Sequence, residues 1–109
     1  MRGTPVENDH ENNARVFKAF CDVNRLKIIE MLQSGEKCAC VILENVDISQ
    51  PTLSHRMKVL CDSGIVLPRK AGKWTHYSIS EEGRNYAIEL LRRLTDVTAA
   101  ECFTERCCE

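Results

Sequence analysis

The chain has no long apolar run and no segment with the composition of a flexible interdomain linker. No stretch approaches the roughly 18 consecutive apolar residues of a membrane span, and residues 1–10 lack the apolar segment of a signal peptide. Only 5 glycines and 3 prolines occur among 109 residues, without a Gly/Pro/Ser-rich linker. We therefore expect a cytoplasmic protein without a membrane partner. Its length predicts a single domain over residues 1–109, with a core at about 11–97 and a Cys-rich tail at 98–109.

The motifs of common enzyme sites are also missing. The chain has no Cys-x-x-Cys on a strand–helix–strand pattern and no Gly-rich phosphate loop. So short a chain is not expected to enclose a large substrate pocket. We expect that the protein is not an enzyme and has no organic cofactor; a small thiol oxidoreductase is kept as a remote alternative.

Charge is nearly balanced over the whole chain but unevenly placed along it. The formal net charge is −1, yet residues 49–79 carry five basic residues and one acidic residue, a local net charge of +4. The rest of the chain must then carry −5. A basic region on an otherwise acidic chain is typical of a compact DNA-binding protein.

The hydrophobic pattern predicts helices in the first half of the chain. A first helix spans Asn12–Phe20, and in a second Leu26, Ile29 and Leu32 repeat every three residues before Gly35 ends it. A short third helix is expected from about Cys38 to Asn45.

The fourth predicted helix has the clearest boundaries. Ser49 is a suitable N-cap, Pro51 suits the first turn, and the helix ends at Gly64. Its apolar residues repeat at i, i+4 and i+7: Leu53, Met57 and Leu60. Two helices across a short turn, the second polar on its outer face, are typical of a helix-turn-helix.

The pattern then changes to that of strands. Residues 65–67 and 74–79 are rich in β-branched and aromatic residues and flank a basic loop at 69–73, which predicts a β-hairpin wing. Ser80 can cap a last helix with the apolar stripe Ala87, Leu90, Leu91, Leu94 and Val97. We expect this stripe to form the surface of a homodimer. The predicted fold is mainly α with a small β-hairpin: a dimeric winged helix-turn-helix of about five helices and a two-stranded wing.

The seven cysteines are many for such a chain. In a reducing compartment they should remain thiols, so that a metal or redox role is favoured over disulfides. Cys21 and Cys61 fall within helical patterns and are interpreted as small buried residues. Cys38 and Cys40 form a Cys-x-Cys pair at a predicted helix start, where the helix dipole and nearby Lys37 favour thiolates. Residues i and i+2 of a helix point about 200° apart, so binding of one ion by both sulfurs should unwind or re-aim the start of this helix.

Five strings of residues resemble the ArsR family of arsenic-responsive repressors in order and spacing. They lie between about Ala14 and Leu94: residues 24–29, the Cys38-Ala39-Cys40 pair, and residues 48–60, 63–66 and 72–78. The resemblance implies a winged-helix dimer that binds operator DNA and dissociates when trivalent arsenic or antimony, its inducer, binds cysteine thiolates.

The residue types on the fourth helix suit DNA contact independently of the resemblance. Gln and Arg side chains pair with base edges, and Ser and Thr with bases or phosphate. The candidates on this helix are Gln50, Thr52, Ser54, His55, Arg56 and Lys58. On the wing, Arg69, Lys70 and Lys73 are expected to contact phosphate or the minor groove. His55 and His76 are interpreted as polar or DNA-facing residues rather than metal ligands.

The candidate ion-binding residues are Cys38, Cys40, Cys102, Cys107 and Cys108. Many family members carry a third cysteine three residues after the pair, where this chain has Leu43. The tail cysteines either complete the Cys38/Cys40 site, in the same subunit or across the dimer, or form a separate three-thiolate site.

Two other sensor classes stay open. A zinc- or cadmium-responsive repressor of this fold is one, although the family's sites on the last helix use His with carboxylates and this chain has no His after His76. A thiol-redox or persulfide-responsive repressor is the other.

Overall fold

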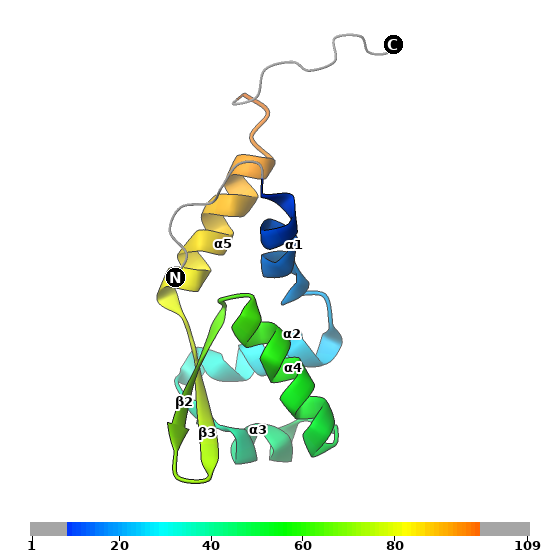
Figure 1. Cartoon of the computed structure of the whole chain (residues 1–109), viewed down its shortest axis with the longest axis vertical. Helices are drawn as coiled ribbons and strands as arrows, with labels where there is room; N and C mark the ends of the chain where they lie inside the picture. Colours follow the sequence, from blue (N-terminus) through cyan, green and yellow to red (C-terminus); the bar gives the residue numbers. More distant parts are fainter. Residues whose placement is uncertain (1–8, 99–109) are drawn as a thin grey trace.

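The computed structural model describes residues 9–98 and contains a small sheet with helices beside it and beyond the base of its hairpin (Figure 1). The helices and strands, in order, are α1 (His10–Lys18), α2 (Val23–Met31), the 3₁₀ turn η1 (Leu32–Ser34), β1 (Lys37–Cys38), α3 (Ala39–Asn45), α4 (Gln50–Asp62), β2 (Val66–Ala71), β3 (Trp74–Ile79) and α5 (Glu81–Leu94). The predicted winged helix-turn-helix with five helices is confirmed. None of the helices described between residues 9 and 98 is long and apolar enough to cross a membrane.

The sheet contains a strand that the sequence analysis did not predict. Its three antiparallel strands lie in the order β1-β3-β2, so that β3 is central. The hairpin pairs Val66 with Ile79 at its base and Ala71 with Trp74 at its tip. Strand β1 adds only two pairs, Lys37 with Tyr77 and Cys38 with His76. Through these pairs the segment just before α3 is joined to the wing.

Side chains cap the helices, and the two serine caps at Ser49 and Ser80 were predicted from the sequence. The Ser49 hydroxyl accepts a hydrogen bond from the backbone N–H of Thr52 at 3.3 Å, and the Ser80 hydroxyl accepts one from Gly83 at 2.9 Å. Asp9 and Asp22 cap α1 and α2 in the same way. Each cap satisfies a backbone donor that lacks a helical partner.

The main core lies between α2, α3, α4 and the sheet. Its fully buried side chains include Ile28, Ile42, Met57, Leu60 and Val66. The predicted apolar face of α2 was partly wrong, because Leu26 is half-exposed and Ile28 is fully buried. Residues spaced three or four apart lie on the same face of a helix. Here Ile28 and Leu32, which are four residues apart, face the core.

A second, smaller cluster joins α1 to α5, which lie side by side away from α3 and the hairpin tip (Figure 1). It buries Val16, Tyr86 and Leu90, and the Tyr86 hydroxyl donates to Asn13 Oδ1 at 3.2 Å. Only Leu90 of the predicted stripe is fully buried. Ile88, Leu91 and Leu94 remain about half-exposed on α5. Val97 was predicted on this helix, but the helix ends at Leu94 and Val97 is 89% exposed beyond it.

The start of α5 is held tightly against the turn after α4. The Ser80 N–H donates to Ile65 O at 2.8 Å, and the buried Gly83 faces the backbone of Gly64. A Cβ at position 83 would overlap the Gly64 carbonyl oxygen, a backbone atom that cannot move independently.

We therefore expect Gly83→Ala to destabilise the protein by about 1–3 kcal/mol, although alanine ordinarily favours helix. Urea unfolding measures the change. Asn85→Ala, at an exposed position of the same helix, is the matched control and should shift the free energy of unfolding by less than about 0.5 kcal/mol. A Gly83→Ala protein as stable as the original would contradict the close approach.

Candidate nucleic-acid interface and thiol site

Helix α4 has a buried face and an exposed polar face. Leu53, Met57 and Leu60 point into the core. On the opposite side the structure leaves four of the predicted contact residues exposed: Gln50, Ser54, His55 and Lys58. Lys58 also forms an ion pair with Asp62 one turn later, at 3.1 Å. This face presents hydrogen-bonding side chains to solvent over the full length of the helix.

The other two predicted residues of α4 are engaged within the chain. The Thr52 hydroxyl accepts from the Ser49 hydroxyl at 2.9 Å and is half-buried. Arg56 Nε lies 3.1 Å from Asp22 Oδ2 in a half-buried ion pair. Asp22 is also the N-cap of α2, so Arg56 joins α4 to the start of α2. The Arg56 charge is therefore partly balanced within the chain.

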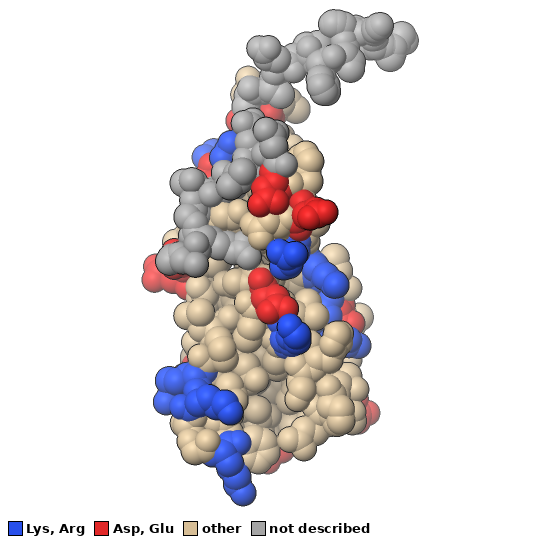
Figure 2. All heavy atoms as spheres, in the orientation of Figure 1, with Lys and Arg blue, Asp and Glu red and all other residues tan. Residues whose placement is uncertain are grey.

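The wing carries the exposed positive charge. Gly72, with a φ of 67°, allows the tight turn that places Lys73 at the hairpin tip. Lys70 and Lys73 are exposed, and within residues 9–98 neither side chain has a hydrogen-bond or ion-pair partner. Figure 2 shows Lys and Arg side chains gathered over this end of the hairpin.

Arg69 differs from the two lysines because Glu36 neutralises it. Its Nε and Nη2 atoms donate to the two carboxylate oxygens of Glu36, each at 2.8 Å. This forked contact lowers the pKa of Glu36 from its ordinary value. Arg69 thus connects β2 to the segment preceding β1.

The two sulfurs of the Cys-x-Cys pair lie together, and the predicted divergence was wrong. Cys38 is an extended residue of β1 and the N-cap of α3, with φ −71° and ψ 146°, while Cys40 lies in the first helical turn. The Cys38 and Cys40 Sγ atoms are 2.7 Å apart, and the Cys40 N–H donates to Cys38 Sγ at 3.3 Å. The 200° separation applies only to two helical residues. Both sulfurs can therefore approach one ion with α3 intact.

The two thiols are not equivalent. The hydrogen bond from the Cys40 thiol, with smaller help from backbone N–H groups, lowers the pKa of Cys38. The same hydrogen bond, with burial, raises the pKa of Cys40. The expected help from Lys37 is absent within the described residues, since its ammonium donates to Ser34 Oγ and Gly35 O at 2.8 and 3.2 Å. The backbone N–H of Cys40, which donates to Cys38 Sγ, also favours a thiolate at Cys38.

The remaining cysteines do not join this pair in residues 9–98. Cys21 was predicted to be buried within a helix, but it is exposed in the turn after α1. Cys61 is half-buried against the core, and burial raises its pKa to about 11. Leu43, at the position of the missing third cysteine, packs against the core. Cys102, Cys107 and Cys108 lie outside the described residues.

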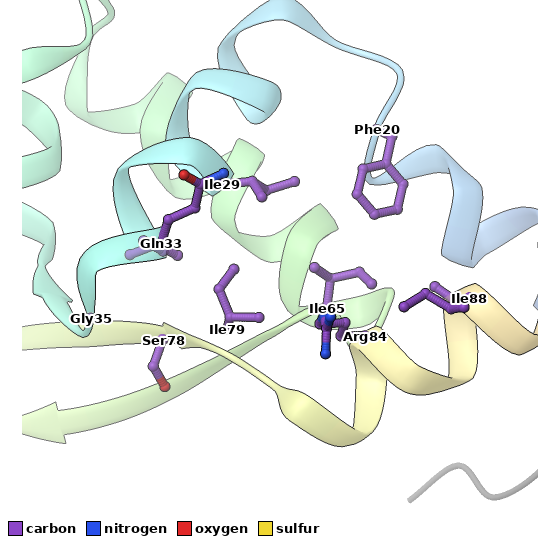
Figure 3. Close-up of a pocket in the computed structure, with 11 residues that line it drawn as sticks. Phe20, Ile29, Gln33, Gly35, Ile65, Ser78, Ile79, Arg84 and Ile88 are labelled. Atoms are coloured by element: carbon purple, nitrogen blue, oxygen red, sulfur yellow. The ribbon is translucent and has the colours of Figure 1, made fainter.

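An apolar groove of about 610 Å³ lies between α2, β3 and α5 and was not predicted (Figure 3). Phe20, Ile29 and Ile79 line it together with Ile88, and Arg84 is its only charged lining residue. The expectation that so short a chain forms no sizeable pocket was wrong. Ser78 is its only hydroxyl side chain, and the lining contains no cysteine, no histidine and no carboxylate that could activate that hydroxyl as a nucleophile. Segments far apart in the sequence form it, and no local pattern indicates it.

Comparisons with known families and proteins agree with this geometry. Residues 22–67 match the model of the arsR family of bacterial regulatory proteins. The chain is 38% identical to an HTH-type transcriptional regulator of Methanocaldococcus jannaschii over 78% of this chain and 97% of that protein. It is 44% identical to an arsenical resistance operon repressor of Staphylococcus xylosus, over 65% of this chain and 68% of that one. A cadmium resistance regulatory protein homolog of Staphylococcus aureus is 38% identical, over 70% and 64%.

Solved structures show the same fold. The crystal structure of an ArsR family transcriptional regulator superposes with a TM-score of 0.75 at 18% identity, covering 89% of this chain and 100% of that one. A homodimeric winged helix-turn-helix DNA-binding domain from Mycobacterium bovis superposes with a TM-score of 0.64 at 24% identity, covering 95% and 100%.

The unequal thiols predict an order of alkylation by iodoacetamide near neutral pH. A lowered pKa leaves more of Cys38 as thiolate, and a raised pKa leaves less of Cys61, so Cys38 should react faster than Cys61. Cys40→Ala removes the hydrogen bond that lowers the Cys38 pKa and should slow the reaction of Cys38. Peptide mass mapping measures each rate, with Cys21→Ala as control. Equal rates at Cys38 and Cys61, or no effect of Cys40→Ala, would refute this assignment.

Proposed function

Because the chain belongs to the ArsR family of transcriptional regulators, we propose that it represses an operon whose operator it releases when trivalent arsenic or antimony binds Cys38 and Cys40. The observation that carries this proposal is the 2.7 Å approach of the two sulfurs at the junction of β1 and α3. Thiolates are the donors that a thiophilic ion prefers. The arsenical resistance repressor among the relatives supports the same inducer class.

The exposed face of α4 reads the operator in this proposal, and the wing adds phosphate contacts. Gln50, Ser54 and His55 are free to meet base edges, with Thr52, Arg56 and Lys58 beside them. Lys70 and Lys73 can contact phosphate without breaking an ion pair within the chain. Arg69 can add its positive charge only if it leaves Glu36.

A homodimer would place two such helices on the two halves of an operator. The half-exposed apolar residues of α5, Ile88, Leu91 and Leu94, favour this assembly, because a second copy would remove them from water. The Mycobacterium bovis domain, whose fold this chain shares, is a homodimer and supports it.

Release follows from the position of the thiol pair. Cys38 is paired with His76 of the wing, and Cys40 is in α3, which leads directly into α4. An ion held by both sulfurs fixes the angle between these elements. The protein leaves DNA if the ion binds the angle of the DNA-free form more tightly, with a coupling of typically about 1–3 kcal/mol.

A second candidate is a thiol-redox sensor, which the short sulfur–sulfur distance also favours. An oxidant such as a peroxide would remove two protons and two electrons from Cys38 and Cys40 to form a disulfide. Release by oxidant that a reductant reverses, without any response to arsenic, would select this candidate.

The wing assignment predicts a specific effect of Lys73→Ala. The variant should weaken binding to all sequences alike and reduce the slope of log affinity against log salt by about one. Lys27→Ala, an exposed lysine of α2, is the control and should leave the slope unchanged. Fluorescence anisotropy with labelled operator at several salt concentrations measures both. An unchanged slope in Lys73→Ala would remove the wing from the interface.

The thiol assignment predicts that replacing Cys38 and Cys40 by Ser preserves operator affinity but abolishes release by trivalent arsenic. Neither side chain lies on the exposed face of α4, so binding should not suffer. Cys21→Ser, at an exposed cysteine remote in sequence, should respond normally. Release is followed by anisotropy during an arsenic titration.

A further variant locates the third thiolate. If the tail completes the site, replacing Cys102, Cys107 and Cys108 by Ser should raise the arsenic concentration needed for release. If the tail is a separate primary site, that change should abolish release and the Cys38/Cys40 change should not. Release that survives loss of all five cysteines would falsify the mechanism.

A further inference from the structure

The pairing of β1 with β3 places His76 beside the thiol pair. Cys38 and His76 are directly opposed in the antiparallel register. Opposed residues share one face of a sheet, with Cβ atoms about 4.5–5.5 Å apart. Tyr77 and Ile79 of β3 pack against the core. Because successive side chains of a strand point to opposite faces of the sheet, His76 lies on the face away from the core, together with Cys38. Both Cys38 and His76 are half-buried.

Residues 9–98 place no other histidine in a comparable position. Leu43 cannot bind an ion, and His10 and His55 are exposed on α1 and α4. Arg69 is the other cross-strand neighbour of His76. Its positive charge is balanced by Glu36, so its repulsion of a bound cation is reduced. The exposed carboxylate of Glu44 on α3 adds negative potential near the two sulfurs, which favours a bound cation.

We propose that His76 supplies the third donor of the ion held by Cys38 and Cys40, giving a set of two sulfurs and one nitrogen. The inference rests on the proposed function, in which these two thiolates bind the inducer. Within residues 9–98 no three His, Cys, Asp or Glu side chains already converge on one point, so the imidazole turns toward the sulfurs as the ion binds. This is a side-chain rotation and requires no unwinding of α3.

The donor set determines which ions the site accepts. Zinc and cadmium take mixed sulfur and imidazole ligands, with solvent completing the coordination. Trivalent arsenic gains less from an imidazole because it favours sulfur. The site therefore binds Zn²⁺ or Cd²⁺ in addition to trivalent arsenic, and His76 matters more for the divalent ions. A bond to His76 also acts directly on β3, the wing strand that directly follows Lys73.

The test uses the full chain with Cys102, Cys107 and Cys108 replaced by Ser, so that tail thiolates cannot substitute. Cd²⁺ and trivalent arsenic are titrated separately, and thiolate-to-ion absorption reports binding. His76→Gln should weaken Cd²⁺ binding at least about tenfold and arsenic binding less than about threefold. His10→Gln, the same change at an exposed histidine, should affect neither ion.

His76→Cys is the complementary variant, since it converts the set to three sulfurs. It should tighten arsenic binding about tenfold or more, and it serves as the test if His76→Gln does not fold. Cd²⁺ affinity within twofold of the parent in His76→Gln, or no gain of arsenic affinity in His76→Cys, would overturn the role of His76. Replacing Cys38 and Cys40 by Ser separates the two claims. If both ions still bind, the proposed function itself fails; if neither binds and the His76 variants have no effect, only this inference fails.

Discussion

The two-residue pairing of β1 with β3 is the constraint on which the thiol site depends. Because Lys37 and Cys38 pair with the wing, Cys38 is held in an extended conformation and caps α3 instead of forming part of it. That conformation brings its sulfur to the sulfur of Cys40. The same pairing joins the thiol pair to the wing, and α3 joins it to α4. One small element therefore connects the proposed ion site to both parts of the proposed DNA interface.

Ion pairs within the chain reduce the charge available to DNA. Residues 49–79 carry five basic side chains, but Arg56, Lys58 and Arg69 each have a carboxylate partner. The half-buried Arg56–Asp22 pair and the forked Arg69–Glu36 pair connect different elements, so they stabilise the relative positions of α2, α4 and the sheet. Exposed single pairs contribute little to stability, typically about 0–1 kcal/mol. Their larger consequence here is that Lys70 and Lys73 hold the readily available positive charge.

Local signals in the sequence were sufficient for most of the fold. Ser49 and Ser80 each cap a helix with their own side chains, and the spacing of Leu53, Met57 and Leu60 defined the buried face of α4. The site depended on contacts between distant segments, which such signals do not contain. A two-residue strand has no pattern of its own, and without β1 the Cys-x-Cys pair was interpreted as helical. The ion pairs of Arg56 and Arg69 could not be predicted from the sequence, because their partners Asp22 and Glu36 are 34 and 33 residues away.

The central claim is that the thiol pair binds its ion in the conformation already present and acts on the wing through β1 and β3. Amide hydrogen exchange with and without trivalent arsenic tests it most directly. The amides of α3 and of its C-cap residue Val46, which donates to Ile42 O at 3.1 Å, should keep or gain protection on ion binding, and protection should change along β1 and β3. Loss of protection throughout α3, with β3 unaffected, would show that the ion unwinds the helix and would contradict the account.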